Sequence, residues 1–344
     1  MNPCALSIIM SSLALGTITT LSSYHWVVAW VGLEINTLAI IPLMTKTPHP
    51  RAIEAATKYF LTQAAASALI LFSSTLNTWL TGEWSINNEI NNASAILLSI
   101  AIAMKLGIAP FHFWLPEVLQ GVTLQTGLIL STWQKFAPMA LLIQLSQSVN
   151  LDLMLILGLL SALIGGWGGI NQTQIRKILA FSSIAHLGWM VAILKISPQL
   201  TLLNFALYIL MTSTLFLTFL YLDTKNIHEL SVSWSKAPAL SALSLLSLLS
   251  LSGLPPLTGF MPKWLIAQEM VKQDLTMFAL IILMSTLLSL FFYLRLTYIM
   301  SLTLAPNSSN STLNWFIHKK NPLAIPTTLS LLLLPITPMI FCSF

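Results

Sequence analysis

The sequence predicts an all-α polytopic membrane protein, and three observations carry that prediction. Hydrophobic residues fill 56% of the 344 positions and charged residues only 7%, whereas soluble domains carry roughly 25% charged residues. Apolar runs of about 20 residues, the length that crosses a hydrocarbon core, recur from one end of the chain to the other. Two of these runs are broken by glycine and proline. The composition therefore excludes an ordinary soluble protein.

We expect eleven membrane-spanning helices. Their expected bounds are 3–20, 25–45, 52–78, 93–119, 123–145, 151–170, 175–194, 200–222, 238–269, 275–300 and 323–342. The fourth and the ninth are longer than one crossing needs. This excess length is expected of helices with an irregular middle.

The charges of the connecting loops predict the orientation. Loops on one side hold eight cations, which are Lys46, Arg51, Arg176, Lys177, Lys225, Lys236, Lys319 and Lys320. The opposite loops hold two, Lys195 and Lys272. Because Lys and Arg accumulate on the inner side, we expect the N-terminus inside and, after eleven crossings, the C-terminus outside. These loops account for the net charge of +5, so a nucleic-acid surface is not predicted.

Two broken helices predict a transport path. The first break reads KLGIAPFH from Lys105 to His112, and the second reads GLPPLTGFMPK from Gly253 to Lys263. An interrupted helix at membrane depth leaves backbone groups unpaired, which is tolerated only beside a polar cavity. Paired breaks in two halves of a chain are typical of transporters. A lysine beside each break indicates a charged cargo, and a proton is the simplest candidate.

The positions of the breaks predict an internal repeat. The first break falls in the fourth crossing of helices one to five, and the second in the fourth of helices six to ten. The following helix carries a basic residue in each half, Lys135 and Arg295. Because five is odd, the second unit enters the membrane from the opposite side. We expect inverted five-helix repeats over 1–148 and 149–303, followed by a loop and a C-terminal helix over 304–344.

Six titratable residues are expected within the spans or at their breaks: Glu34, Lys105, His112, Lys135, His186 and Lys263. A charge inside a span costs at least about 2.5–3.5 kcal/mol on insertion scales. Each of these residues is therefore expected to have a role that offsets this cost. Burial disfavours the charged form of a lysine, and a nearby carboxylate restores it. Histidine titrates nearest neutrality. Such a row of groups is suited to passing protons.

Simpler interpretations of these residues stay open. Glu34 is alternatively a satisfied buried carboxylate paired to a neighbouring helix. Lys263 lies near the outer end of its helix and alternatively extends its amine to the headgroups. Glu54 and Lys58, one turn apart near a helix end, are predicted to form a surface ion pair.

Other site classes find no support in the sequence. Cys4 and Cys342 lie at opposite ends of the chain and are predicted on opposite sides of the membrane, so no disulfide is expected. No Cys-x-x-Cys or His-x-x-x-His spacing predicts a metal site. The glycines between Gly165 and Gly169 are interpreted as close helix packing, because no strand precedes them to form a nucleotide-binding fold.

Several short strings, in order, carry a resemblance to a known family. They are Asn2-Pro3, Trp30-Val31-Gly32-Leu33-Glu34, Lys58-Tyr59-Phe60-Leu61, Lys105-Leu106-Gly107, Pro110-Phe111-His112-Phe113-Trp114, Asn171-Gln172-Thr173-Gln174-Ile175-Arg176-Lys177 and Ser252-Gly253-Leu254-Pro255-Pro256. Over its whole length the chain resembles the antiporter-like proton-pumping subunits of respiratory complex I.

The resemblance implies a role for each titratable residue. Glu34 is implied to pair with Lys105, and Lys135 to be the central lysine of a hydrophilic axis. Lys263 is implied to be the terminal group that faces the exit side. The two histidines match positions near the water chain that connects the lysines.

The resemblance also implies the surroundings of the chain. NADH, FMN, iron–sulfur clusters and ubiquinone are expected in other subunits, so this chain is expected to hold no cofactor, metal or redox centre. The expected partners are other membrane-arm subunits, including a neighbouring antiporter-like subunit and small hydrophobic subunits, together with lipids. The expected location is the mitochondrial inner membrane, with the N-terminus in the matrix and the C-terminus in the intermembrane space. Bacterial relatives begin with three further helices, whose place a lipid or an accessory subunit is expected to take.

Three functions remain under consideration. The first is a core membrane-arm subunit of the proton-pumping NADH:ubiquinone oxidoreductase, driven by quinone reduction elsewhere in the complex. The second is a free-standing cation/proton antiporter, which usually needs a carboxylate for its cation, and only Glu34 is clearly within the membrane. The third is a structural spacer whose buried charges form inert pairs.

Overall fold

A computed structural model describes residues 3–86, 90–302 and 323–334 of the chain. The secondary structure of this part is helical, apart from turns and two isolated β-bridges. The helices are α1 (Pro3–Leu21), α2 (Trp26–Met44), α3 (Pro50–Thr81), α4 (Asn92–Leu106), α5 (Trp114–Gly121), α6 (Leu124–Ser131), α7 (Trp133–Gln144), α8 (Leu151–Ile170), α9 (Ile175–Ile193), α10 (Pro198–Leu222), α11 (Ile227–Ser231), α12 (Ser233–Lys236), α13 (Pro238–Ser252), α14 (Phe260–Lys272), α15 (Thr276–Leu302) and α16 (Ala324–Leu332).

The predicted all-α membrane class is confirmed. Six of the described helices are long and apolar enough to cross a membrane, namely α1, α2, α3, α8, α10 and α15. The apolar helices α4 and α13 are shorter, because each is one part of an interrupted span. The last expected crossing, 323–342, is described only as far as residue 334, where it contains α16.

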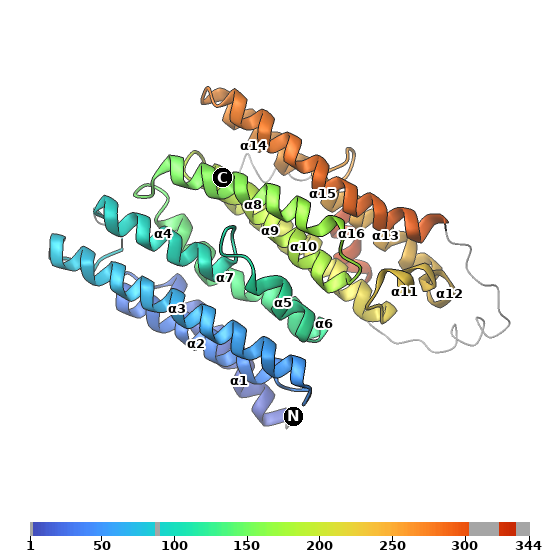
Figure 1. The fold of residues 1–344 in the computed structure, drawn as a ribbon, viewed down its shortest axis with the longest axis horizontal. Coiled ribbons are helices and arrows are strands. Elements are labelled where there is room, and N and C mark those ends of the chain that lie inside the picture. Colours follow the sequence, from blue (N-terminus) through green and yellow to red (C-terminus); the bar gives the residue numbers. More distant parts are fainter. Residues whose placement is uncertain (1–2, 87–89, 303–322, 335–344) are drawn as a thin grey trace. The chain divides into compact units, whose positions relative to one another are not determined.

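The chain forms two compact units, residues 1–161 and 162–344. In the first unit, α1, α2 and α3 lie side by side (Figure 1), and α3 packs against both α4 and α5. Small residues permit the close approach of α1 and α2. A Cβ atom added at Gly16 would lie 2.5 Å from Asn36 Oδ1, and one added at Gly32 would lie 2.6 Å from Thr19 Oγ1.

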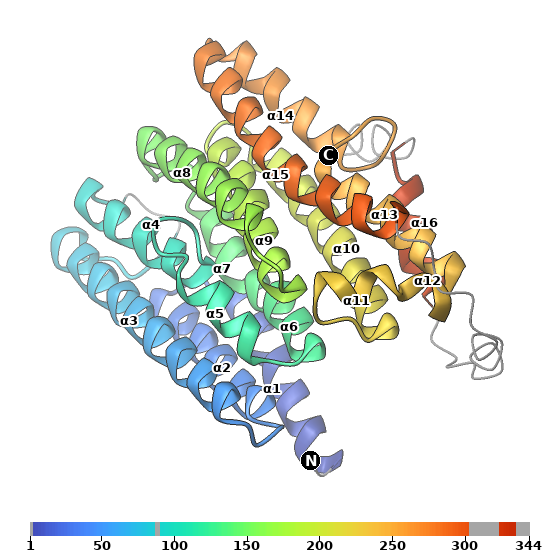
Figure 2. The ribbon, with the colours of Figure 1, turned by 45° about the vertical axis from the view of Figure 1, so that its right-hand side comes forward.

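In the second unit, α15 packs against α9, α13 and α14 (Figure 2). Glycines at the end of α8 face residues of this unit. A Cβ at Gly165 would lie 2.6 Å from the backbone nitrogen of Ala185, and one at Gly169 would lie 2.7 Å from Phe292 Cδ1. The prediction that this glycine cluster serves close helix packing is confirmed.

Two predicted elements differ from the structure. The expected fifth crossing, 123–145, is two helices, α6 and α7, separated at Thr132. The Thr132 hydroxyl donates to the Leu128 carbonyl at 2.7 Å, and Pro138 lacks the N–H that would bond the carbonyl of Gln134. The segment between the eighth and ninth crossings was expected to be a loop, but it holds α11 and α12, and α11 begins with a capping box.

Candidate functional site

The first predicted break is confirmed between α4 and α5. α4 ends at Leu106, and Gly107 adopts a φ of 76°, which favours glycine. The N–H of Gly107 donates to the Ala103 carbonyl at 3.0 Å. The indole Nε1 of Trp114, the first residue of α5, donates to the Met104 carbonyl at 3.1 Å. Carbonyls that the interruption would leave unpaired are thus satisfied.

The second predicted break is confirmed between α13 and α14. α13 ends at Ser252, and Gly253 has a φ of 84°. The Lys263 ammonium, in the first turn of α14, donates to the Ser252 carbonyl at 2.7 Å. A cation is stabilised there by the negative end of the helix dipole. The amine turns back to the break, so the alternative in which it extends to the headgroups is not observed.

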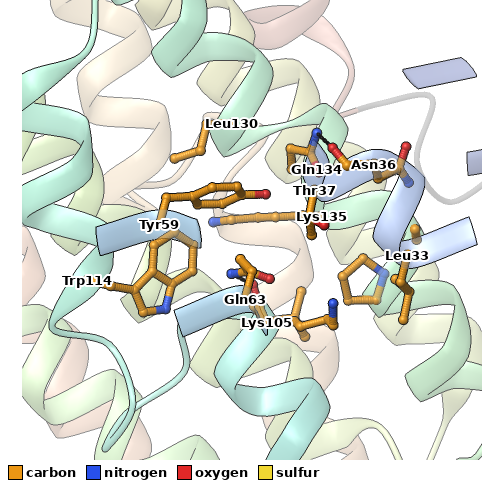
Figure 3. A pocket seen from close by; sticks show the side chains of 13 residues that line it. Leu33, Asn36, Thr37, Tyr59, Gln63, Lys105, Trp114, Leu130, Gln134 and Lys135 are labelled. Carbon is orange, nitrogen blue, oxygen red and sulfur yellow. Dashed lines mark hydrogen bonds between the residues drawn. The ribbon is translucent and has the colours of Figure 1, made fainter. Parts of the chain in front are cut away.

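A small polar cavity lies at the first break and brings two of the predicted lysines together. It measures about 20 Å³, which is room for one ordered water, since a water needs about 10–15 Å³. Lys105 and Lys135 both line it and are buried, with 5% and 3% of their surface exposed. The rest of the lining is Leu33, Asn36, Thr37, Tyr59, Gln63, Leu106, Trp114, Leu130, Gln134, Ala137 and Pro138 (Figure 3).

Two glutamines hold the backbone around this cavity. Gln63 on α3 donates its amide to the Lys105 carbonyl at 3.4 Å, and Gln134 on α7 donates to the Asn36 carbonyl at 3.2 Å. In Figure 3 Gln63 lies between the side chains of Lys105 and Lys135, and Lys135 runs along the Tyr59 ring. The Lys105 ammonium has no hydrogen-bond partner among the described residues. The side-chain amide of Asn36, which lines the same cavity, also lacks a partner within this part of the chain, so a water there would satisfy buried polar groups.

Glu34 does not contact Lys105 in this structure. The ion pairs within the described part of the chain join Lys58 to Glu54, Lys58 to Glu117 and Lys272 to Glu269. Glu34 instead accepts a hydrogen bond at 3.2 Å from Thr37, one turn along its own helix. It acts on Lys105 only through longer-range electrostatic attraction. The pairing that the resemblance implied is therefore not formed in this structure.

A second cavity, of about 10 Å³, brings together His186 and Lys263 in the second unit. Its other lining residues are Ala185, Trp189, Ser289 and Tyr293. His186 lies in the middle of α9, where nearly every residue is buried. His112, in contrast, is buried in the first break and lines neither cavity; its ring packs against that of Phe113 in a tilted arrangement, with centroids 4.3 Å apart.

Ion pairing at the end of α3 is wider than the sequence predicted. The expected contact of Lys58 with Glu54 is confirmed at 2.6 Å. The same ammonium contacts Glu117 on α5 at 2.7 Å. Sequence reasoning missed Glu117 because it lies 59 positions further on. Lys58 thereby ties the helix that follows the first break to α3.

Sequence reasoning also missed the neutral polar residues of both cavities. Gln63, Gln134 and Tyr293 carry no charge, so they did not stand out among the many serines and threonines of the spans. A glutamine in the middle of an apolar helix is a signal that would have found the first two. Within the described residues, no group of three or more His, Cys, Asp or Glu side chains is placed to hold a metal ion.

Two family models together cover nearly the whole chain. The model of the NADH:quinone oxidoreductase/Mrp antiporter transmembrane family matches residues 23–289, and that of the NADH dehydrogenase subunit 2 C-terminus matches residues 290–341. The chain belongs to this antiporter-like family, as a member of its subunit 2 branch. The family resemblance predicted from the sequence is confirmed.

Relatives within the family are similar to this chain over nearly its whole length. The chain is 62% identical over 340 residues to NADH-ubiquinone oxidoreductase chain 2 of Aquarana catesbeiana, covering 98% of each chain. It is 62% identical over 342 residues to the same chain of Xenopus laevis, covering 98% of this chain and 99% of that one. With Squalus acanthias the identity is 59% over 344 residues, covering 99% of each.

Solved structures share the fold. A chain of respiratory complex I from Thermus thermophilus with bound aureothin matches with a TM-score of 0.86 and 26% identity, over 98% of this chain and 79% of that chain. A chain of the Mrp complex from Dietzia sp. matches with a TM-score of 0.80 at 18% identity, over 88% of this chain and 62% of that one.

Proposed function

We propose that the chain translocates protons across the membrane with the help of six buried or half-buried groups, Glu34, Lys105, His112, Lys135, His186 and Lys263. As a member of its family it is an antiporter-like subunit of the membrane arm of complex I and so part of NADH:ubiquinone oxidoreductase. The observation that carries the proposal is the pairing of buried amines with small cavities at both helix breaks. The energy would come from quinone reduction elsewhere in the complex.

In this proposal, the formation and loss of a contact between Glu34 and Lys105 drives the proton. Two unit charges 4 Å apart attract by about 4 kcal/mol at an effective dielectric constant of about 20. Moving one charge across 100 mV requires about 2.3 kcal/mol. Formation and loss of this single contact is therefore large enough to drive one proton. Approach of Glu34 would load Lys105, and its return to Thr37 would release the proton.

The cavities suggest the order of the transfers. Lys105 and Lys135 share the first cavity, which has room for one water, so we propose that a proton passes between them there. His186 and Lys263 share the second. Because His112 lines neither cavity, we place it beside the break and not between the two lysines. Lys263 would be the last group before the exit side.

Matching local features support the proposed inverted repeats over 1–148 and 149–303. α4 and α13 each contain 15 residues and end at a glycine of positive φ. An isolated antiparallel bridge joins His25 to Ser85 in the first unit and Gln174 to Asn226 in the second. Each bridge links the start of the unit's second crossing to the end of its third. The odd number of crossings in each repeat would invert the second.

The proposed setting follows the loop charges and the family. The chain would lie in the mitochondrial inner membrane, with the cationic loops and the N-terminus in the matrix and the C-terminus in the intermembrane space. Its partners are other complex I subunits. A neighbouring antiporter-like subunit, small hydrophobic subunits and lipids would cover its flanks. NADH, FMN, iron–sulfur clusters and ubiquinone would bind in those other subunits.

A double variant distinguishes proton translocation from an inert structural pair. Replacing Glu34→Gln and Lys105→Met together removes the driving contact and the first acceptor, while leaving no uncompensated charge. In complex reconstituted into sealed vesicles, we expect fewer protons moved per NADH oxidised. An assembled double variant with the wild-type proton yield would contradict the proposal and favour a structural spacer.

A further inference from the structure

A buried tyrosine lines the second cavity, and its hydroxyl has no hydrogen bond of standard geometry among the described residues. Tyr293 on α15 is 1% exposed and lines this cavity together with His186 and Lys263. Within the described part of the chain its hydroxyl has no hydrogen bond of standard geometry, although it interacts with the Ser182 side chain on α9. Burying an unpaired hydroxyl costs free energy that a phenylalanine at this position would not incur. The hydroxyl therefore calls for an explanation other than packing.

Three helices deliver the polar groups of this cavity. His186 comes from α9, Lys263 from α14 and Tyr293 from α15, and α9 contacts both other helices, which also pack together. The Lys263 amine is fixed by its bond to the Ser252 carbonyl at 2.7 Å. An apolar cluster that includes Trp189, Ile266 and Ile282 joins the same three helices. The groups are thus held in one small, rigid space.

The second hydroxyl group among the lining residues, that of Ser289, already has a hydrogen-bond acceptor. Ser289 lies one turn before Tyr293 and donates its proton to the Thr286 carbonyl of its own helix at 2.8 Å. Tyr293 has no such local acceptor, because the geometry of its ring carries the hydroxyl away from the backbone. Of these two hydroxyls, that of Ser289 is bonded to a carbonyl of its own helix and that of Tyr293 is not.

We propose that the Tyr293 hydroxyl relays the proton between His186 and Lys263, a step that rests on the proton translocation proposed above. A hydroxyl donates and accepts at the same time. The His186 imidazolium would give its proton to the tyrosine oxygen, while the tyrosine's own proton passes to the neutral Lys263 amine. The phenol is neutral before and after the step.

The geometry accommodates both states of the acceptor. A neutral lysine amine keeps two N–H donors and one lone pair, so it can bond the Ser252 carbonyl and still receive a proton. The cavity of about 10 Å³ is near the lower limit for one water. One ordered water can therefore extend the relay between the hydroxyl and either neighbour.

The test is Tyr293→Phe, which removes the hydroxyl and keeps the ring. The matched control is Tyr298→Phe on the same helix, whose side chain is 64% exposed. Purified complex carrying each change is reconstituted into sealed vesicles, and the protons moved per NADH oxidised are compared with those of Lys263→Met. We expect Tyr293→Phe to lower the yield to the level of Lys263→Met, and Tyr298→Phe to retain the wild-type yield.

The outcomes separate the relay from the wider proposal. If Lys263→Met lowers the proton yield and assembled Tyr293→Phe does not, the relay is overturned and translocation through this unit stands. If Lys263→Met and His186→Gln both keep the wild-type yield, the proposed path through this cavity fails and the relay with it. If Tyr293→Phe does not assemble, Tyr293→Met is measured against the same two standards.

Discussion

The buried Lys105 and the half-buried Lys263 lie where the helical backbone is incomplete. Lys105 is in the last turn of α4, and Lys263 bonds the terminal carbonyl of α13. A helix C-terminus carries roughly half a negative charge, so each break supplies part of the stabilisation that a buried ammonium needs. Each helix break and the lysine beside it are therefore electrostatically linked.

The absence of a side chain at Gly253 leaves room for the Lys263 amine. Its φ is 84°, and a Cβ atom there would lie 2.9 Å from Lys263 Nζ. Gly253→Ala therefore combines about 1–2 kcal/mol of left-handed strain with displacement of the amine. Gly82→Ala is the matched control, because Gly82 has a φ of 77° and no atom within 4 Å of the added Cβ. We expect both variants to lower the thermal stability of the complex and only Gly253→Ala to lower the proton yield; equal proton yields would contradict this account.

Gln63 is expected to position Lys105. Its side-chain amide donates a buried hydrogen bond, at 3.4 Å, to the Lys105 carbonyl and so links α3 to α4. Gln63→Ala frees that carbonyl, at a cost of about 1–3 kcal/mol for an unsatisfied buried group, and loosens the cavity. We expect a lower proton yield in reconstituted vesicles, whereas Ala at the exposed Gln268 should have no effect. A wild-type yield in assembled Gln63→Ala would assign the glutamine to packing alone.

At the residue scale, the sequence predicted which charged residues lie within the spans, but not which side chains they contact. Glu34, Lys105, Lys135 and Lys263 stood out because charges are rare in this chain. Neutral cavity residues such as Gln63 did not, because hydroxyls and amides are tolerated in many spans. The present position of Glu34 was not predictable, since both Thr37 and Lys105 are suitable partners and only the packed structure selects between them.

At the scale of helices, glycine and proline located two breaks but not a third. The breaks after α4 and α13 begin at Gly107 and Gly253, which the sequence shows directly. The interruption at Thr132, where the backbone has a φ of −112° and a ψ of −70°, contains neither residue type, so the pattern that located the other two breaks could not find it. It places Lys135 in the first turn of α7, so the central lysine also lies beside an interrupted helix.

Lys58 is expected to fasten α5 rather than to carry protons. Its contacts with Glu54 and Glu117, at 2.6 and 2.7 Å, lie on exposed side chains, and exposed ion pairs contribute about 0–1 kcal/mol. Glu117→Gln is therefore expected to lower thermal stability slightly and to leave the proton yield unchanged. Glu54→Gln, which retains the contact between α3 and α5, is the control. A reduced proton yield in Glu117→Gln alone would assign this network a part in translocation.

At the scale of the whole molecule, the fold class and the family followed from the sequence. Apolar length, loop charge and paired breaks are properties of single segments, so they can be read without knowing which helices touch. The cavities of about 20 and 10 Å³ are not of this kind. They depend on side chains delivered by several helices each, and small changes in packing open or close them.

The central claim is that buried lysines carry protons through this chain, and Lys135→Met tests it most directly. Lys135 is 3% exposed and lines the first cavity, and methionine keeps its approximate volume without the amine. The measurement is the number of protons moved per NADH oxidised by reconstituted complex, with Met at the exposed loop residue Lys195 as the control. The account predicts a lower yield for Lys135→Met in an assembled complex that still oxidises NADH, and a wild-type yield for Lys195→Met. A wild-type proton yield in assembled Lys135→Met would contradict it.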